Sequence, residues 1–345
     1  MRVTLVATYE LGRQPFGLAS PAAWLREAGI EVTTVDLSRE PFRPEAFATD
    51  MVAFHLPMHT ATRLALPVIR RVRALSPTTR LCCYGLYAPL NASVLRGLGV
   101  ERVLGGEFEQ ALLEVATGGT VPIDGATADD AMPRLRFRVP DRSGLPALDR
   151  YASLQTPSGI RKVVGYTEAS RGCKHLCRHC PVVPIYQGRF RVVPRDVVLA
   201  DIRAQVDAGA QHITFGDPDF FNGVGHAVAI VDAFAREHPG VSYDVTIKIE
   251  HLRQHDDRLA VLRDTGCLFV VSAVESIDDA VLARLEKGHT RADFEQVVAR
   301  CRQVGLTLAP TFIPFTPWTT LAGYHELLRT IDTLDLVAQV APIQL

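Results

Sequence analysis

Residues 165–191 read GYTEASRGCKHLCRHCPVVPIYQGRFR, and this stretch decides how the rest of the chain is interpreted. It contains three cysteines, Cys173, Cys177 and Cys180, in the spacing CxxxCxxC. Three thiolates packed into eight residues repel one another unless a soft cation binds them, and an iron–sulfur cluster or zinc is the usual solution. We therefore expect a metal site here, with the remaining sequence acting as its scaffold.

The composition of the chain is that of an ordinary globular protein. It has 345 residues, of which 47% are hydrophobic, and its 37 basic and 38 acidic side chains nearly cancel. This balance gives no argument for a nucleic acid or an anionic membrane as partner. No uncharged apolar run reaches the roughly 18 residues of a membrane-spanning helix. The N-terminus lacks a signal-peptide core, so we expect a cytoplasmic protein.

The four cysteines outside the loop are poor candidates for chemistry. Seven cysteines in total are too few for a disulfide scaffold, and the number is odd. Cys267 and Cys301 stand alone in apolar surroundings, as core residues do. Cys82 and Cys83 are adjacent on an expected strand, so their side chains point to opposite faces and chelate poorly.

The first 118 residues alternate between short apolar runs and amphipathic segments. This alternation predicts a Rossmann-like, doubly wound parallel sheet. The expected strands are 2–9, 30–36, 50–55, 80–84 and 102–104. The expected helices are 20–28, with Ser20 as its cap, 62–75, 91–98 and 107–116.

Ligands of such sheets bind at the carboxyl ends of the strands. Gly85, Gly105 and Gly106 lie at these ends and allow the backbone to approach a ligand closely. The plainer alternative is that these glycines only form tight strand-to-helix turns. His55 and His59 also lie near a strand end, where a histidine either faces a cofactor or simply hydrogen-bonds its neighbours.

The second half of the chain predicts a partial (β/α)6 barrel. Residues 119–160 are rich in proline and glycine, which predicts an extended linker that runs across the domain following it. From 161 to 345 six strand-and-helix repeats follow. The expected strands are 162–168, 211–216, 243–249, 267–274, 306–313 and 338–345. The expected helices are 195–208, 224–238, 254–265, 277–286, 292–304 and 321–333.

Polar residues gather where these barrel strands end, and the cysteine loop follows the first strand. In barrels of this kind the chemistry is found at the carboxyl ends of the strands. The candidate site residues at the other strand ends are Gly216, Asp217, Asp219, Lys248, Glu250, Glu275 and Ser276.

Three interpretations of the cysteine loop compete. A cubane [4Fe–4S] cluster usually takes four cysteines, so three leave one iron open, as a catalytic site requires. A structural zinc site would use the three cysteines with His175 or His179. An electron-transfer cluster would need a fourth cysteine, and the nearest, Cys267, is expected inside a strand.

The loop, led by Ser170-Arg171-Gly172 after a first barrel strand, resembles the radical S-adenosylmethionine (SAM) superfamily. The resemblance implies a [4Fe–4S] cluster on Cys173, Cys177 and Cys180 whose open iron binds the amino and carboxylate groups of SAM. It also implies an external electron donor of the flavodoxin or ferredoxin type, reductive cleavage of SAM, and a 5′-deoxyadenosyl radical. The substrate stays unknown.

Other segments extend this resemblance to the rest of the chain. Residues 216–219 (GDPD) stand where the superfamily holds the SAM amino group. Residues 274–276 (VES) and 285–290 (LEKGHT) resemble cobalamin-type members, which implies that Glu275 or Ser276 contacts SAM. Lys248 and Glu250 match a region that lines the SAM pocket.

The N-terminal half resembles the cobalamin-binding domain that precedes many of these enzymes. Residues 105–109 (GGEFE) carry that likeness, and residues 145–151 (LPALDRY) resemble the lead into the catalytic barrel. The loop at 7–20 lacks DxHxxG, so any cobalamin would bind without a lower histidine ligand. Reactions with and without cobalamin therefore both stay open.

The segment after Cys180 points to a narrower group. Residues 180–191 resemble a radical SAM subgroup named for a CUAEP or CCAEP tail, and this sequence contains no such tail. His179 stands before the third cysteine, where the superfamily often has an aromatic residue.

Overall fold

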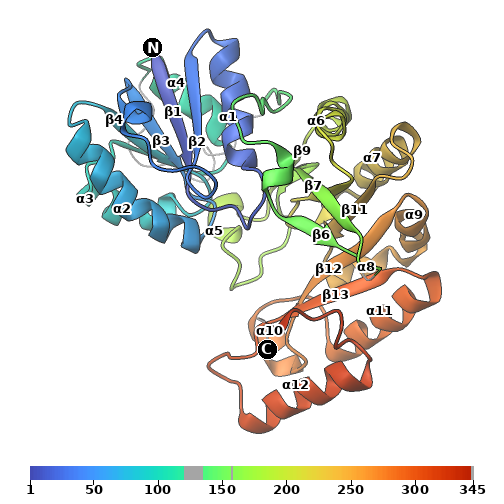
Figure 1. Cartoon of the computed structure of the whole chain (residues 1–345). Coiled ribbons are helices and arrows are strands. Elements are labelled where there is room, and N and C mark those ends of the chain that lie inside the picture. Colours follow the sequence, from blue (N-terminus) through green and yellow to red (C-terminus); the bar gives the residue numbers. More distant parts are fainter. Residues whose placement is uncertain (120–134, 157, 343–345) are drawn as a thin grey trace. The chain divides into compact units, whose positions relative to one another are not determined.

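The computed structural model describes residues 1–119, 135–156 and 158–342 (Figure 1). The chain folds into two compact units. The first comprises Met1–Tyr166, Pro184–Gln187 and Arg203–Ala210. The second comprises Thr167–Val183, Gly188–Ile202 and Gln211–Leu345.

The first unit contains a five-stranded sheet in the order β2-β1-β3-β4-β5. Every neighbouring pair in this sheet is parallel. The strands are β1 (Arg2–Ala7), β2 (Glu31–Asp36), β3 (Met51–His55), β4 (Arg80–Tyr84) and β5 (Arg102–Leu104). The strand order reverses direction at β1, which is the hallmark of a doubly wound sheet. The predicted Rossmann-like fold is confirmed.

Helices connect these strands, and apolar side chains fill a core on each face of the sheet. The helices are α1 (Phe16–Glu27), α2 (His59–Leu75), α3 (Ala92–Gly97) and α4 (Phe108–Ala116), with short 3-10 turns η1 (Pro44–Phe47) and η2 (Pro89–Asn91). Cys82 belongs to one core and Cys83 to the other, as their adjacency on a strand predicts. Ser20 was expected to cap a helix, but α1 begins four residues earlier; the Ser20 hydroxyl instead donates to Glu109, 2.6 Å away.

The described part of the linker contacts both sheets. The Tyr151 hydroxyl donates to the Asp36 carboxylate at 2.9 Å, and Asp141 pairs with Arg26 at 2.8 Å. The linker was predicted to run across the domain that follows it; Asp141 and Tyr151 instead bind residues of the first unit, whereas residues 153–155 pair with a strand of the second sheet. The last part of the linker forms η3 (Leu148–Arg150) and β6 (Ser153–Gln155), and residues 120–134 and 157 lie outside the described ranges.

A second sheet has the order β13-β12-β11-β10-β7-β6. Its strands besides β6 are β7 (Arg161–Thr167), β10 (His212–Phe215), β11 (Ser242–Thr246), β12 (Cys267–Glu275) and β13 (Thr307–Phe312). The pairs from β10 to β13 are parallel, and β6 is antiparallel to β7. This curled sheet is the predicted partial barrel. The expected sixth strand does not form over residues 338–342, and 343–345 lie outside the described ranges.

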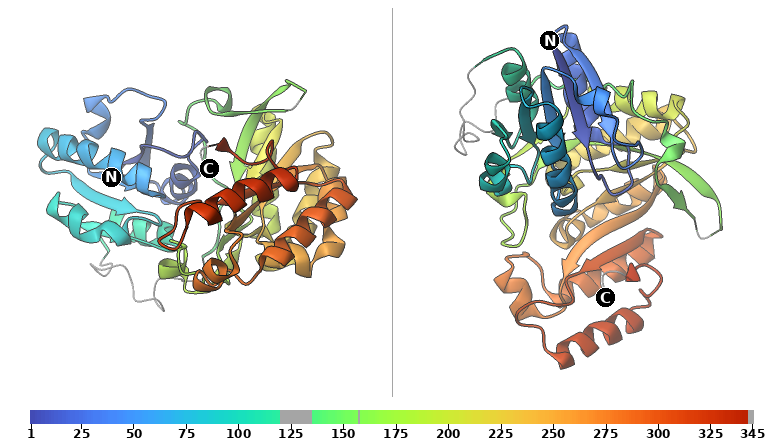
Figure 2. Two further views of the ribbon diagram at one scale, coloured as in Figure 1. Left: turned by 90° about the horizontal axis from the view of Figure 1, so that it is seen from below. Right: turned by 60° about the vertical axis from the view of Figure 1, so that its left-hand side comes forward.

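Helices alternate with the strands of the second sheet (Figure 1). They are α6 (Arg195–Asp207), η4 (Phe220–Gly223), α7 (Val224–Glu237), α8 (Ile249–Gln254), η5 (Asp256–Arg258), α9 (Leu259–Asp264), α10 (Asp279–Arg284), α11 (Arg291–Val304) and α12 (Leu321–Thr333). Helices α11 and α12 lie side by side (Figure 2), and Arg291 joins them through Glu326 at 3.0 Å. None of the described helices is both long and apolar enough to cross a membrane.

One strand end differs from its prediction in a way that affects the site. The strand expected over 243–249 ends at Thr246, and helix α8 begins at Ile249. Lys248 therefore precedes the helix and Glu250 lies in its first turn, whereas the sequence pattern placed both on the strand. The helical turn brings Glu250 and His251 to the end of β11 together.

Candidate active site at the cysteine loop

The cysteine loop leaves the carboxyl end of β7 and is closed by a small antiparallel pair, β8 (Ser170–Gly172) and β9 (Phe190–Val192). Asp217, at the end of β10, anchors the start of this pair. It accepts hydrogen bonds from the Ala169 amide at 2.9 Å and the Ser170 hydroxyl at 2.5 Å. Burial raises the pKa of the Asp217 carboxyl to about 6, although these hydrogen bonds oppose the rise.

The three loop cysteines are free, and Cys177 is buried while Cys173 and Cys180 are partly buried. Burial raises the pKa of the Cys173 thiol, and the nearby Cys180 adds to the rise. Burial likewise raises the pKa of Cys180, with a further contribution from Cys177. Three thiols that disfavour one another's charge need a cation to become ligands together. This donor set fits an iron–sulfur cluster with one iron free of protein ligands.

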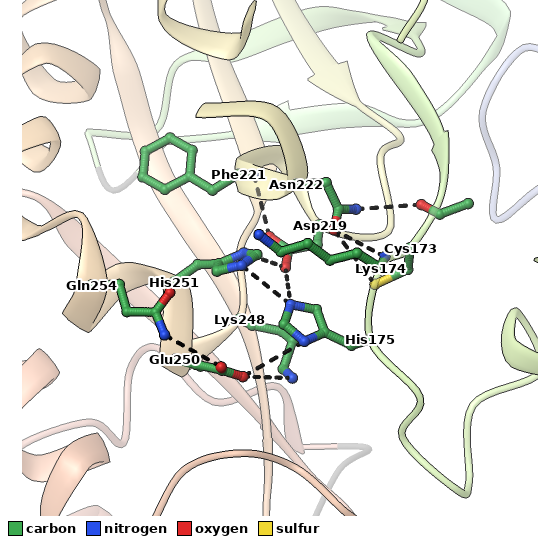
Figure 3. Close-up of polar contacts among 11 residues, drawn as sticks. Cys173, Lys174, His175, Asp219, Phe221, Asn222, Lys248, Glu250, His251 and Gln254 are labelled. Carbon is green, nitrogen blue, oxygen red and sulfur yellow. Dashed lines mark hydrogen bonds and ion pairs between the residues drawn. The ribbon is translucent and has the colours of Figure 1, made fainter. Parts of the chain in front are cut away.

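His175, between the first two cysteines, lies among charged side chains of the segments that follow β10 and β11 (Figure 3). Its Nε2 is 3.5 Å from the Asp219 carboxylate and 3.2 Å from Nε2 of His251. Its Nδ1 is 3.6 Å from the Glu250 carboxylate, which the Lys248 ammonium approaches to 3.2 Å. His175 thus faces a carboxylate that is itself held by a lysine.

The same arrangement recurs at the second histidine of the loop. Nε2 of His179, between Cys177 and Cys180, is 3.0 Å from Oε1 of Glu275. The Lys287 ammonium, which is 3% exposed, lies 3.5 Å from the same oxygen. Each loop histidine therefore contacts a carboxylate that a buried lysine approaches, and His175 contacts the Asp219 carboxylate as well. These two chains of contacts fix the loop to the ends of β11 and β12.

The carboxylates around the loop are held in their charged form. Burial alone would raise the pKa of Glu275, but the hydrogen bond from His179 and the charge of Lys287 outweigh it and lower the pKa. Glu250 follows the same balance, with Lys248 as the main opposing group. The pKa of Asp219 is also lowered, because His175 and His251 outweigh the effect of its burial. The site is therefore a set of paired charges.

The turn after α10 supplies residues that the sequence analysis did not assign individually. A Cβ atom on Gly288 would lie 2.4 Å from the Glu250 carboxylate, so only glycine lets this turn approach the site. His289 is buried, and burial together with Lys287 and Lys248 lowers its pKa to about 4. The LEKGHT motif signals this turn. Nothing in the sequence pattern signals His251.

The remaining predicted residues of this half fall into two groups. The Gly216 amide donates to the Thr167 carbonyl at 2.8 Å, so Gly216, like Asp217, holds the backbone of the site. Ser276 accepts a hydrogen bond from the Asp278 amide and lines a cavity of about 70 Å³ with Glu275 and Trp318. The structure brings together Asp219, Lys248, Glu250 and Glu275 around the cysteine loop. Their roles as SAM contacts stay predictions.

Two of the predicted glycines at the strand ends of the first sheet are packed closely by neighbouring residues. A Cβ atom on Gly85, whose φ is +107°, would meet the Leu56 carbonyl at 3.1 Å, and one on Gly105 would meet Pro89 at 2.5 Å. Gly106 also has a positive φ, of 62°. These three glycines thus have a turn or packing role, and their contact with a cofactor stays a prediction.

His55 is enclosed and paired within the first unit. It is buried, with its Nδ1 3.3 Å from Glu10, and a Cβ atom on Gly17 would lie 2.0 Å from its ring. His59 is the exposed first residue of α2. His55 is therefore enclosed by its neighbours and is not presented as a metal ligand.

The fold and the loop together define an enzyme with a metal-cluster site at the carboxyl edge of a curled parallel sheet. Residues 167–330 match the family model of the Radical SAM superfamily. This segment, a little under half of the chain, is a radical SAM domain. Enzymes of this class use SAM, a reductant and a substrate.

The curated relatives that match include methylthiotransferases. A tRNA-2-methylthio-N(6)-dimethylallyladenosine synthase from Bordetella petrii is 26% identical over 200 residues, which is 54% of this chain and 41% of that protein. The ribosomal protein uS12 methylthiotransferase RimO from Porphyromonas gingivalis is 26% identical over 178 residues, 48% of this chain and 40% of that protein. The chain thus spans about two fifths of the length of these relatives.

Two solved structures share the fold over nearly the whole chain. TsrM from Kitasatospora setae, a radical SAM methyltransferase with cobalamin and a [4Fe–4S] cluster bound, superposes with a TM-score of 0.73 at 17% identity, covering 97% of this chain and 70% of that one. OxsB, a cobalamin-dependent SAM radical enzyme, gives 0.68 at 14% identity, covering 99% and 58%. At these identities the likeness establishes the fold.

Proposed function

We propose that the chain binds a [4Fe–4S] cluster on Cys173, Cys177 and Cys180 and cleaves SAM reductively there to begin radical chemistry. We further propose that it uses cobalamin to methylate or rearrange its substrate. The observation that carries the proposal is the three-cysteine loop at the end of β7, with no fourth cysteine beside it in the described part of the chain. Cys267 and Cys301 are instead buried core residues of the second unit.

When bound, the cluster supplies the electron that breaks the sulfonium bond of SAM. The chain's own residues hold and orient the reactants. Lys248 and Lys287 are buried cations suited to a carboxylate such as that of the methionyl group. Asp219 and Glu275 are buried, charged acceptors suited to an ammonium group or a ribose hydroxyl. Asp217 fixes the hairpin that carries the cysteines.

Cobalamin is supported by the first sheet and by its structural neighbours. The likeness to TsrM and OxsB, both described with cobalamin, extends over the N-terminal sheet as well as the curled one. Open α/β sheets bind ligands at the carboxyl ends of their strands, where Gly85, Gly105 and Gly106 form turns. His55 is enclosed by glycines and paired with Glu10, so we propose that the cobalt has no histidine ligand from this chain.

The curated relatives favour a second candidate, methylthiolation of an RNA or a ribosomal protein. Their printed names specify a tRNA and the ribosomal protein uS12. Near-neutral net charge therefore does not argue against a nucleic-acid substrate for this chain. The two candidates differ in whether sulfur enters the product, which the mass gained by the modified substrate distinguishes: a methyl group alone, or a methyl group and one sulfur atom.

Anaerobic reconstitution tests the proposal. The full chain is loaded with iron and sulfide, with and without hydroxocobalamin, and then given a reductant and SAM. We expect about four iron and four sulfide per chain, 5′-deoxyadenosine as a product, and retained corrinoid. One zinc per chain and no nucleoside product would reject the radical reaction. A retained cluster with no corrinoid would reject only the cobalamin part.

A further inference from the structure

We propose that the cluster-free protein binds one divalent transition-metal ion, ferrous iron or zinc, through Cys173, His175, Asp219 and His251. This site differs from the zinc site that the sequence suggested, because it uses one loop cysteine instead of three. This proposal does not depend on whether the protein cleaves SAM.

The donor atoms are already gathered at metal-binding separations. Ligand atoms of Cys173, His175 and Asp219 all lie within 4.8 Å of one another, and His251, which is outside this group, adjoins it through His175 and Asp219. Four ligands held at 2.0–2.2 Å around a tetrahedral ion are separated by about 3.3 Å. The His175 Nε2 is 3.5 Å from the Asp219 carboxylate and 3.2 Å from the His251 Nε2, which agrees with this spacing. Figure 3 shows the two imidazole rings and the carboxylate converging.

Without an ion, the buried side chains of the proposed site leave polar atoms without hydrogen bonds. The side chains of Asp219 and His251 are 0% and 1% exposed. Asp219 Oδ2 and His251 Nδ1 lie 2.7 Å apart, but neither has a hydrogen-bond partner of suitable angle within the described part of the chain. A buried carboxylate beside two imidazoles is costly unless its lone pairs are used. A cation bound between them would use these lone pairs.

The chemistry of the donors selects the kind of ion. One thiol, two imidazoles and one carboxylate suit zinc or ferrous iron better than calcium or magnesium, which prefer oxygen. Without an ion, Cys173 remains a thiol that points toward the Asn222 amide oxygen at 3.8 Å, and ion binding releases its proton. The cluster also requires Cys173, so cluster and single ion exclude each other. The site is therefore a property of the protein before cluster assembly.

Cobalt(II) titration of the full chain, purified without its cluster and kept anaerobic, tests this site. We expect one equivalent to bind, with the visible bands of tetrahedral cobalt and a thiolate-to-cobalt charge-transfer band. His251→Gln and Asp219→Asn should each lower the affinity at least about tenfold. Cys173→Ser should remove the charge-transfer band. His255→Gln is the matched control, because His255 follows the same helix and its ring lies 6.0 Å from that of His251, whereas it is His251 that contacts His175 and Asp219.

The double variant Cys177→Ala/Cys180→Ala decides between this site and an ion held by the three loop thiols. We expect it to keep the cobalt bands and the affinity of the wild-type chain. Loss of the bands in this variant would overturn the proposal, as would unchanged affinity in His251→Gln. Circular dichroism of each metal-free variant shows that it is folded. If Asp219→Asn or His251→Gln does not fold, the double variant still decides the question.

Discussion

The two parallel sheets of this protein present opposite kinds of carboxyl edge. At the edge of the first sheet, apolar and backbone atoms fill the space above the glycines, and the single buried histidine, His55, is paired with Glu10. At the edge of the second sheet, two lysines and three carboxylates are buried or half-buried around three cysteines, and the two loop histidines contact these carboxylates.

This difference follows from what each edge is built to hold. Buried charges destabilise a fold unless they are paired or bind a ligand, so an edge that keeps two lysines and three carboxylates together is organised for chemistry. The first edge also buries three carboxylates, those of Asp36, Glu107 and Glu109, but no lysine and no cysteine cluster lies with them among its described residues. Four predictions test this comparison, from the largest expected effect to the smallest.

The largest effect is expected from removing one loop thiolate. Cys177→Ala leaves two ligands, so the cluster should not be retained and 5′-deoxyadenosine should fall below detection. Cys301→Ala is the matched control, because Cys301 is a buried core residue of the same unit, and it should keep full product formation. Product is measured by chromatography after reduction in the presence of SAM. Turnover by Cys177→Ala would refute the ligand assignment.

A smaller effect is expected from breaking one buried charge pair of the second edge. Lys287→Met leaves Glu275 without its lysine and should lower the free energy of unfolding by about 3 kcal/mol. The control is Arg178→Met, which breaks a pair with Glu286 whose side chains are 69% and 46% exposed, and should cost less than about 1 kcal/mol. Urea unfolding is followed by Trp318 fluorescence in a Trp24→Phe background. Equal losses of unfolding free energy in the two variants would contradict the distinction between buried and exposed charge pairs.

Stability should also depend on pH through His289, whose pKa is lowered from 6.5 to about 4 in the fold. As the pH falls, the unfolded chain gains a proton near 6.5 while the folded chain does not until about 4, so stability is full above 6.5 and declines below it. Between pH 7 and pH 5 the wild type should lose roughly 2 kcal/mol more than His289→Gln. The same fluorescence assay on the cluster-free chain measures the unfolding free energy at each pH. Parallel pH profiles for the wild type and His289→Gln would show that His289 does not cause the pH dependence.

The smallest effect is expected at the first edge. His55→Gln should change the affinity for hydroxocobalamin by less than about twofold, because His55 is enclosed and paired instead of presented as a ligand. Equilibrium dialysis of the full chain measures this affinity. Loss of corrinoid binding in a folded His55→Gln variant would show that the two edges are more alike than their geometry indicates.

Local sequence signals predicted most of the fold and the centre of the site. The strand-to-helix alternation indicated both sheets, and the CxxxCxxC spacing indicated the cysteine loop. Lys248 and Glu250 lie beside the cysteine loop, but their predicted place on a strand was wrong because the strand ends at Thr246 and helix α8 begins at Ile249. Apolar periodicity did not distinguish this short helix from a continued strand, since both bury Ile247 and Ile249.

The residues that sequence reasoning missed are those that depend on contacts between distant segments. His251 is close to His175 only because α8 turns back toward the loop, 76 residues away in the chain. Lys287 contacts Glu275 from the turn after α10. In that turn Gly288 lies so close to Glu250 that a Cβ atom would collide with the carboxylate. No spacing rule encodes such contacts. The linker prediction missed a contact of the same kind, because Tyr151 binds Asp36, which lies 115 residues earlier.

The most direct test of the central claim is electron paramagnetic resonance of the reduced, reconstituted protein before and after SAM is added. If three cysteines at the second edge leave one iron open, SAM binds that iron and changes the signal of the reduced cluster. An identical signal with and without saturating SAM would contradict the account.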